Sequence, residues 1–195
     1  MKTTLTSLLI AAMLCSINST FAQTRIGANV GLAIPNGDNA DGSGSGLGLN
    51  GRVLFPLSDN FLLGANAGYH NAATISFVPF TLAGEYLFCQ GEGLRPYIGM
   101  DMGIYKVSYT VEETYYGYNW WYGLQPETRT YEVSNNKFGW AVHAGLYLSL
   151  SDHIDLNADV KYNTISASEH YELRYIDISA GLFFKIGSTT QSYKK

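Results

Sequence analysis

Eight charged residues stand at alternate positions of segments that are otherwise apolar or small, and their side chains are the ones best suited to chemistry. A closed sheet would direct all eight toward one interior, because residues two apart on a strand share a face. Opposite charges gathered there can neutralise one another, which favours a plug of salt bridges. A narrow channel for small solutes is the alternative. The eight residues are Arg52, Glu85, Asp101, Asp155, Asp159, Lys161, Asp177 and Lys185.

Catalysis is the second chemistry to consider, because Ser168, Glu169 and His170 place a nucleophile and a base side by side. His143 and His70 are weaker candidates for the base. Neighbours in a polar loop arise easily without a catalytic role, so a solvated loop is the preferred interpretation and no enzyme activity is expected. The four histidines are scattered, without the spacing of a metal site, and we predict neither a metal nor a cofactor.

The longest connection in the chain, about 106–137, is rich in aromatic residues. Its centre, Tyr115 to Tyr122, reads YYGYNWWY, and alternating residues on both sides of it predict that the flanking strands continue as a hairpin beyond the closed sheet. Exposed aromatic rings are typical of contact surfaces for a protein or a glycan. Alternatively, the rings cover the mouth of a barrel or rest among lipid headgroups. The candidate recognition residues are Tyr116, Tyr118, Trp120, Trp121 and Tyr122.

The elements that must position these residues are strands, because apolar residues recur at every second position. The pattern is clearest from Tyr175 to Ile186, where one face is apolar and the other carries Asp177 and Lys185. Each predicted strand has about the ten residues that a tilted membrane-spanning strand needs. Pro79, which cannot donate to a ladder, predicts a bulge or the barrel rim. The eight predicted strands are 25–34, 47–55, 61–70, 75–88, 97–105, 138–150, 154–163 and 175–186.

These strands predict an all-β fold, a closed eight-stranded antiparallel up-and-down transmembrane β-barrel. A bilayer tolerates only a sheet without open edges, so the last strand must pair with the first. The connections largely alternate between long and short, as in barrels whose external loops are longer than their periplasmic turns. A soluble lipocalin-like barrel is the structural alternative. It is disfavoured because so many charges around a ligand cavity would be costly to bury.

The two ends of the chain are predicted to lie outside the barrel. Residues 1–22 have a basic start, an apolar run and a small-residue cleavage site at Ala22, which together indicate a secretory signal peptide. Cleavage would leave Cys89 as the only cysteine, so no intramolecular disulfide is expected. The formal net charge of −4, without a basic cluster, argues against nucleic acid as a partner. The barrel domain is predicted over 23–187 and a short polar tail over 188–195.

Near the C-terminus, four residues have the spacing polar, any, glycine, any two, apolar, any, apolar: Ser179, Gly181, Phe184 and Ile186. By this spacing and the eight-strand pattern, the chain resembles the small outer-membrane β-barrels of Gram-negative bacteria, the family that includes OmpX and the transmembrane domain of OmpA. In that family the spacing is an insertion signal read by the barrel-assembly machinery. The chain departs from the family habit of ending on an aromatic residue, since residues 187–195 follow.

The resemblance implies a monomeric integral protein of the outer membrane, surrounded by lipid and exported through a cleaved signal peptide. It also implies a structural or surface-interaction role through the external loops, with a host protein or a glycan as the partner. Some barrels of this size are channels or lipid-modifying enzymes, so a narrow channel and a rim enzyme stay as alternatives.

Overall fold

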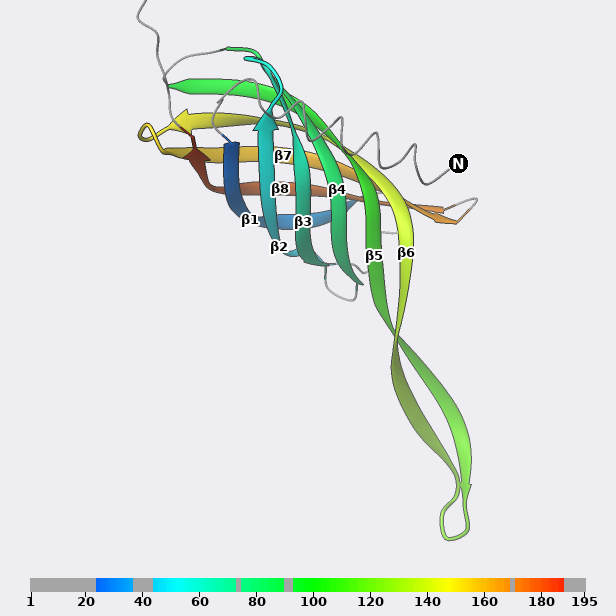
Figure 1. The fold of residues 1–195 in the computed structure, drawn as a ribbon. Helices are drawn as coiled ribbons and strands as arrows, with labels where there is room; N and C mark the ends of the chain where they lie inside the picture. The colour runs from blue at the N-terminus through cyan, green and yellow to red at the C-terminus, as the bar shows by residue number, and fades with distance from the viewer. Residues whose placement is uncertain (1–23, 37–43, 73–74, 90–92, 169–170, 188–195) are drawn as a thin grey trace, which may run out of the picture.

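The computed structural model describes residues 24–36, 44–72, 75–89, 93–168 and 171–187, whose regular structure is all β-strand. Each strand is antiparallel to its neighbours and the first also pairs with the last, which confirms the predicted closed up-and-down barrel (Figure 1). No helix among the described residues is long and apolar enough to cross a membrane. The strands are β1 Thr24–Asn36, β2 Gly46–Pro56, β3 Phe61–Ala72, β4 Ile75–Leu87, β5 Leu94–Asn119, β6 Gly123–Ser149, β7 Ile154–Ser168 and β8 Tyr171–Ile186.

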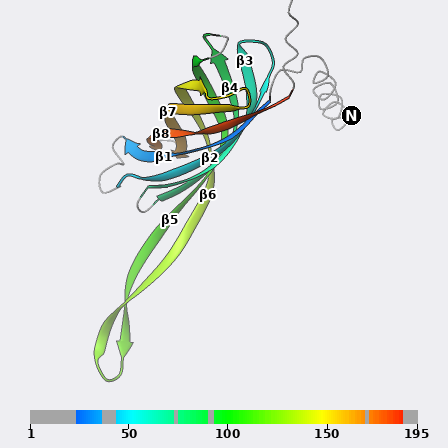
Figure 2. The same cartoon turned by 90° about the vertical axis from the view of Figure 1, so that its left-hand side faces the viewer.

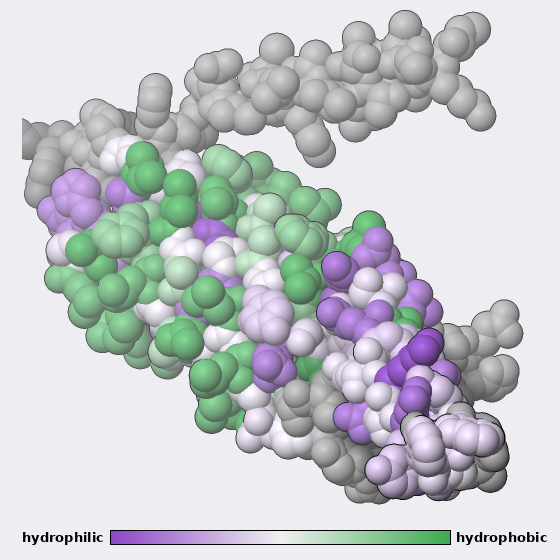
Figure 3. Space-filling model, turned by 90° about the horizontal axis from the view of Figure 1, so that it is seen from below, coloured by the Kyte–Doolittle hydropathy of each residue, from purple (hydrophilic) through white to green (hydrophobic). Residues whose placement is uncertain are grey.

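The seam that closes the barrel lies between β1 and β8. Its register runs without a break from Thr24 opposite Ile186 to Asn36 opposite Arg174. Because side chains alternate between the two faces, a slip of one residue would turn the apolar set inward. The observed register keeps apolar residues on the outer wall, and Figure 3 shows them over much of the barrel on the face in view, with less apolar residues between them. This is the surface that a lipid bilayer requires.

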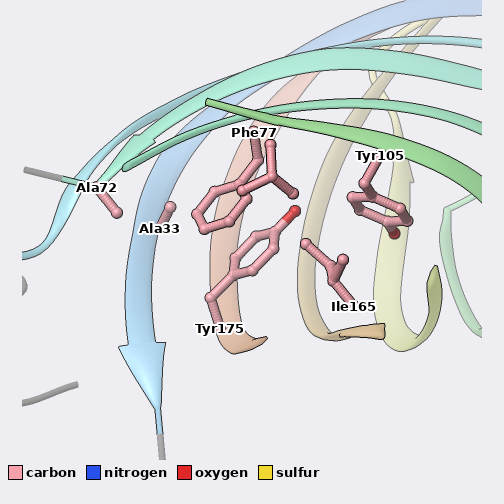
Figure 4. Packing of buried hydrophobic residues seen from close by; sticks show 7 residues of the cluster. Ala33, Ala72, Phe77, Tyr105, Ile165 and Tyr175 are labelled. Atoms are coloured by element: carbon pink, nitrogen blue, oxygen red, sulfur yellow. The ribbon is translucent and has the colours of Figure 1, made fainter. Parts of the chain in front are cut away.

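The interior is filled by side chains, and a central group of charged residues lies between two apolar layers. Along β5, for example, the buried positions run from Tyr97 through Asp101 to Tyr105. In the layer nearer the hairpin, the rings of Phe77 and Tyr175 stack with their centroids 5.0 Å apart (Figure 4). That layer consists of Ala33, Ala72, Phe77, Tyr105, Val107, Ile165 and Tyr175. The layer nearer the short turns consists of Leu54, Leu62, Ala83, Leu87, Tyr97, Tyr147 and Phe183.

The two longest strands, β5 and β6, form the predicted hairpin as a direct extension of the barrel wall. They pair continuously from Leu94 opposite Leu148 to Asn119 opposite Gly123, so the prediction that both strands continue beyond the barrel is confirmed. Pairing of β5 with β4 reaches only to Tyr109. Past that point the hairpin leaves the barrel wall and extends away from it, as two perpendicular views show (Figures 1 and 2).

Of the two alternatives predicted for Pro79, a bulge or the barrel rim, the bulge is absent, because no residue is inserted there. The β3–β4 pairing runs to Ala67 opposite Phe80, skips the next two positions and resumes in the same register at His70 opposite Phe77. Proline lacks the N–H that the ladder would need at this point. The other side of Pro79 pairs normally with β5, so the barrel wall stays closed.

Candidate functional site

Arg52 is the centre of the charged layer in the barrel interior. Its Nη1 donates to Glu85 Oε1 at 2.6 Å, and its Nη2 donates to Asp159 Oδ2 at 3.1 Å. Tyr147 Oη donates to the other oxygen of Glu85 at 2.9 Å. Only 2% of the Arg52 side chain and none of Glu85 is exposed. One buried cation therefore holds carboxylates from two different strands, β4 and β7.

A second ion pair in the same layer joins Lys161 and Asp101, with Nζ 2.5 Å from Oδ2. His143 links this pair to the first group, because its Nε2 lies 3.3 Å from Asp101 Oδ1 and its Nδ1 lies 3.9 Å from Asp159 Oδ2. Ser179 donates a further hydrogen bond to Asp159. The two pairs and the His143 ring therefore form one interior network by proximity, although neither ring nitrogen makes a hydrogen bond among the described residues.

Asp177 differs from the other central carboxylates, since among the described residues it has no lysine or arginine within salt-bridge distance. Asn50 Nδ2 donates to its Oδ2 at 3.0 Å. His70 Nδ1 is 3.9 Å from the same oxygen, and His70 Nε2 is 3.0 Å from Asn50 Oδ1. An amide and an imidazole thus surround this carboxylate.

Asp155 and Lys185, the remaining two of the eight predicted charges, lie together at the turn side of the interior. Lys185 Nζ is 3.1 Å from Asp155 Oδ1. Two further cations, Arg25 and Arg95, also approach Asp155 and were missed by sequence reasoning. Each stands on the same face of its strand as an inward residue two positions later, Gly27 and Tyr97 respectively, so extending the alternation by one step could have identified both.

The hairpin beyond the barrel is stabilised on one face by side chains of facing strands. Tyr131 Oη donates to Glu113 Oε1 at 2.7 Å, and this hydrogen bond raises the pKa of Tyr131. Tyr115 donates to Glu127, and Arg129 Nε donates to Tyr115 Oη at 2.9 Å. Such cross-strand pairs stabilise a two-stranded ribbon that lacks a core of its own.

The tip of the hairpin exposes large aromatic side chains. Tyr116, Trp120, Trp121 and Tyr122 are 70%, 77%, 80% and 77% exposed. The rings of Trp120 and Trp121 meet edge to face with centroids 5.8 Å apart. The side chain of Tyr118, the fifth candidate recognition residue, lies outside the described part of the structure.

Comparison with known proteins gives the family. Residues 4–185 match the family model described as the outer membrane protein beta-barrel domain. The chain belongs to this family. No curated protein sequence matches the chain significantly. An eight-stranded outer-membrane barrel is therefore both the observed fold and the family to which this chain belongs.

Solved structures of outer-membrane barrels have the same fold as this family member. Neisserial surface protein A is 17% identical with a TM-score of 0.65, covering 84% of this chain and 97% of its own. The N-terminal β-barrel domain of Pseudomonas aeruginosa OprF is 14% identical with a TM-score of 0.55, covering 85% and 99%. Ail, the attachment invasion locus protein of Yersinia pestis, is 13% identical with a TM-score of 0.50, covering 86% and 100%. At these identities the likeness concerns the fold alone.

The residues of the predicted insertion signal lie on β8 of this outer-membrane barrel. Ser179 is buried in the interior, while Phe184 and Ile186 are exposed on the outer wall. Gly181 lies against β1 so closely that an added Cβ would be 1.9 Å from the Ala28 carbonyl oxygen. Gly181 therefore has a packing role in the barrel in addition to any role as a signal.

The candidate catalytic run is only partly visible in this outer-membrane barrel. Glu169 and His170, and the side chain of Ser168, lie outside the described residues. His70 and His143 are buried in the interior network, away from the rim. Within the described part of the chain, no group of three or more histidine, cysteine, aspartate or glutamate residues could hold a metal ion.

Proposed function

We propose that this outer-membrane barrel has a structural and surface-recognition role, and that the tip of the β5–β6 hairpin binds its partner. The observation that carries the proposal is the exposure of four large aromatic side chains at one end of a hairpin that barrel closure does not need. A barrel requires only a few residues between two strands, and extra loop length is tolerated without being explained by stability.

The position of the tip favours a role in binding a partner, because the aromatic rings lie too far from the barrel to cover its mouth. Ten residues of β5, Thr110 to Asn119, lie beyond the last pair with β4. At the rise of an extended strand they carry the tip roughly 30 Å from the wall. The rings at the tip then contact neither the barrel opening nor the interior layer formed around Tyr175.

The chemistry of the hairpin favours a neutral or basic partner. The shaft of the hairpin, residues 110–114 and 125–132, carries four exposed glutamates, Glu112, Glu113, Glu127 and Glu132. Arg129 is the single cation in these two stretches. Tyrosine and tryptophan give large contact areas with few rotatable bonds, which makes them effective anchors on protein surfaces and on sugar rings. A basic or neutral protein, or a neutral glycan, fits both features.

A closed interior is part of the same proposal. Two apolar layers and the central charged residues between them fill the interior, which supports a plug in preference to a narrow channel. The exposed apolar wall supports outer-membrane lipid as the surroundings. The insertion-signal spacing on β8 supports assembly by the barrel-assembly machinery, and a closed barrel without open edges supports a monomer. No catalysis is proposed.

Replacing the tip, Tyr115 to Gly123, with a short glycine and serine turn tests this role. Cells that display the wild-type barrel should adhere to host cells or to an immobilised glycan, and the variant should not. Folding is the control: the variant should still migrate as a folded, heat-modifiable band on gels. The variant Tyr109→Ala, at the foot of the hairpin where β5 still pairs with β4, should adhere like the wild type. Adhesion that survives loss of the tip would contradict the proposal.

A further inference from the structure

An unbalanced group of charges lies inside the barrel next to the short turns. Asp155 Oδ2 is 2.5 Å from Arg95 Nη2 and 3.8 Å from Arg25 Nε, and Asp155 Oδ1 is 3.1 Å from Lys185 Nζ. Three cations therefore surround one carboxylate. We refer to Arg25, Arg95, Asp155 and Lys185 as the basal cluster.

The basal cluster is not neutralised by its own surroundings, although the interior as a whole is balanced. Five cations and five carboxylates are buried among the described residues. The central layer holds the opposite excess, since Arg52 and Lys161 there face four carboxylates. The ring of Tyr147 stands between the two groups, with Arg25 Cζ 4.9 Å from its centroid and Glu85 bonded to its hydroxyl. The basal cations therefore lack direct contact with the central carboxylates.

Several hydrogen-bond donors of the basal cluster have no acceptor. Arg25 Nε and Nη1, and Arg95 Nε, are buried without a hydrogen-bond partner among the described residues. Asp155 Oδ2 also lacks a hydrogen bond, but at 3.8 Å it is too far from Arg25 Nε to accept from it. Asp155 Oδ1 already accepts from Ser149 Oγ at 2.9 Å. A buried charged donor without an acceptor is costly, and the cost is removed when an anion supplies the missing oxygens.

We propose that the basal cluster is a binding site for an oxyanion of the phosphate class, at the turn-side opening of the barrel. Two guanidinium groups present planar sets of N–H donors, the geometry that suits phosphate oxygens. The site adjoins the opening because Lys185 Nζ also donates to the carbonyl of Ser151, in the turn between β6 and β7, at 2.9 Å. About a tenth of the Arg95 side chain, 11%, is exposed there. Inorganic phosphate and a phospholipid headgroup share this chemistry.

The test measures the unfolding midpoint of the full-length folded protein in octyl glucoside, a detergent without phosphate. Inorganic phosphate is titrated against chloride at constant ionic strength, and the midpoint should rise and saturate. Arg25→Gln should weaken the apparent phosphate affinity by about tenfold or more, since it removes charge-assisted hydrogen bonds. Arg174→Gln, which removes an exposed cation on the hairpin side, is the matched control and should respond like the wild type.

Asp155→Asn gives a prediction of opposite sign. Removing the only carboxylate of the basal cluster should strengthen phosphate binding, and phosphate should recover much of the stability that the substitution costs. A merely structural ion pair would show neither effect. If Arg25→Gln does not fold, Lys185→Gln replaces it, with the same expected loss of affinity.

A second arm identifies the source of the anion. Micelles that contain phosphatidylglycerol replace inorganic phosphate, and a response to the lipid alone would support the site with a headgroup as its ligand. An unfolding midpoint that responds to neither probe would overturn the proposal. The proposal would equally fail if the folded basal variant, Arg25→Gln or its replacement Lys185→Gln, responded to phosphate with the wild-type affinity.

Discussion

Replacing Arg52 with methionine tests whether the charged layer stabilises the barrel. Methionine keeps much of the length of the side chain but removes both of its charged hydrogen bonds, at 2.6 Å to Glu85 and 3.1 Å to Asp159. Both carboxylates are then buried without their cation. Removing one partner of a buried ion pair costs about 3 to 5 kcal/mol, and we expect the free energy of unfolding to fall by that amount.

The measurement is a urea titration in detergent, with the folded fraction read from unheated gels and from intrinsic fluorescence. Arg174→Met is the control, because Arg174 is half-exposed, pairs with Glu172 at the surface and should change stability very little. Adding Glu85→Gln to the Arg52→Met variant should recover part of the loss, since it removes one of the two stranded charges.

A loss below about 1 kcal/mol in Arg52→Met would refute this reasoning, because it would place the Arg52 contacts in the range of exposed ion pairs. The reasoning would also be contradicted if the two substitutions were additive. The double variant would then have lost the sum of the unfolding free energies lost by Arg52→Met alone and by Glu85→Gln alone. In that case the two residues would contribute independently, and the network would not act as a unit.

Three further predictions concern the wall and the interior. Val160→Arg, near the middle of the lipid-facing wall, should lower the free energy of unfolding by about 2 to 4 kcal/mol, and Leu148→Arg, close to the turn side, should lower it less. Equal losses in urea titrations would contradict the claim that Val160 lies deeper in the bilayer than Leu148. Gly181→Ala should lower the refolding yield in detergent without any assembly machinery, because a Cβ there would lie 1.9 Å from the Ala28 carbonyl oxygen. An unchanged yield would contradict a packing role for Gly181 and leave only its role in the insertion signal. Wild-type protein in planar bilayers should show no steady unitary current, and a reproducible one would argue for a channel.

The fold could be predicted because one physical signal runs through the whole barrel. From Tyr175 to Ile186 of β8, apolar residues hold every second position, and the residues between them are mostly polar or small, with Phe183 as the clear exception. The barrel part of β6 has the same alternation. Period-two alternation identifies both the strands and the face that meets lipid, and barrel closure then fixes the pairing of the ends. The hairpin was predictable for the same reason, since its two arms continue the alternation.

The contacts inside the barrel could not be predicted to the same extent. Sequence parity places Asp155 in the interior, but its cations come from three other strands, and two of these, β1 and β5, are distant from it in sequence. Which of them meet depends on the stagger of the strands around the barrel, and the sequence pattern does not encode it locally. Pro79 is a second feature whose outcome depends on neighbouring strands and could not be predicted from the local sequence. A missing donor can be met by a bulge or by a gap in the ladder, and only the neighbouring pairs decide between them.

The most direct test of the account is a binding measurement on the hairpin tip. The folded wild-type protein and the variant Trp120→Ser/Trp121→Ser are applied side by side to a panel of immobilised glycans and host proteins. The account predicts that the wild type binds at least one basic or neutral member, and that the variant, equally folded by heat modifiability, loses that binding. Equal binding by both proteins would contradict the claim that the hairpin tip is the recognition surface of this barrel.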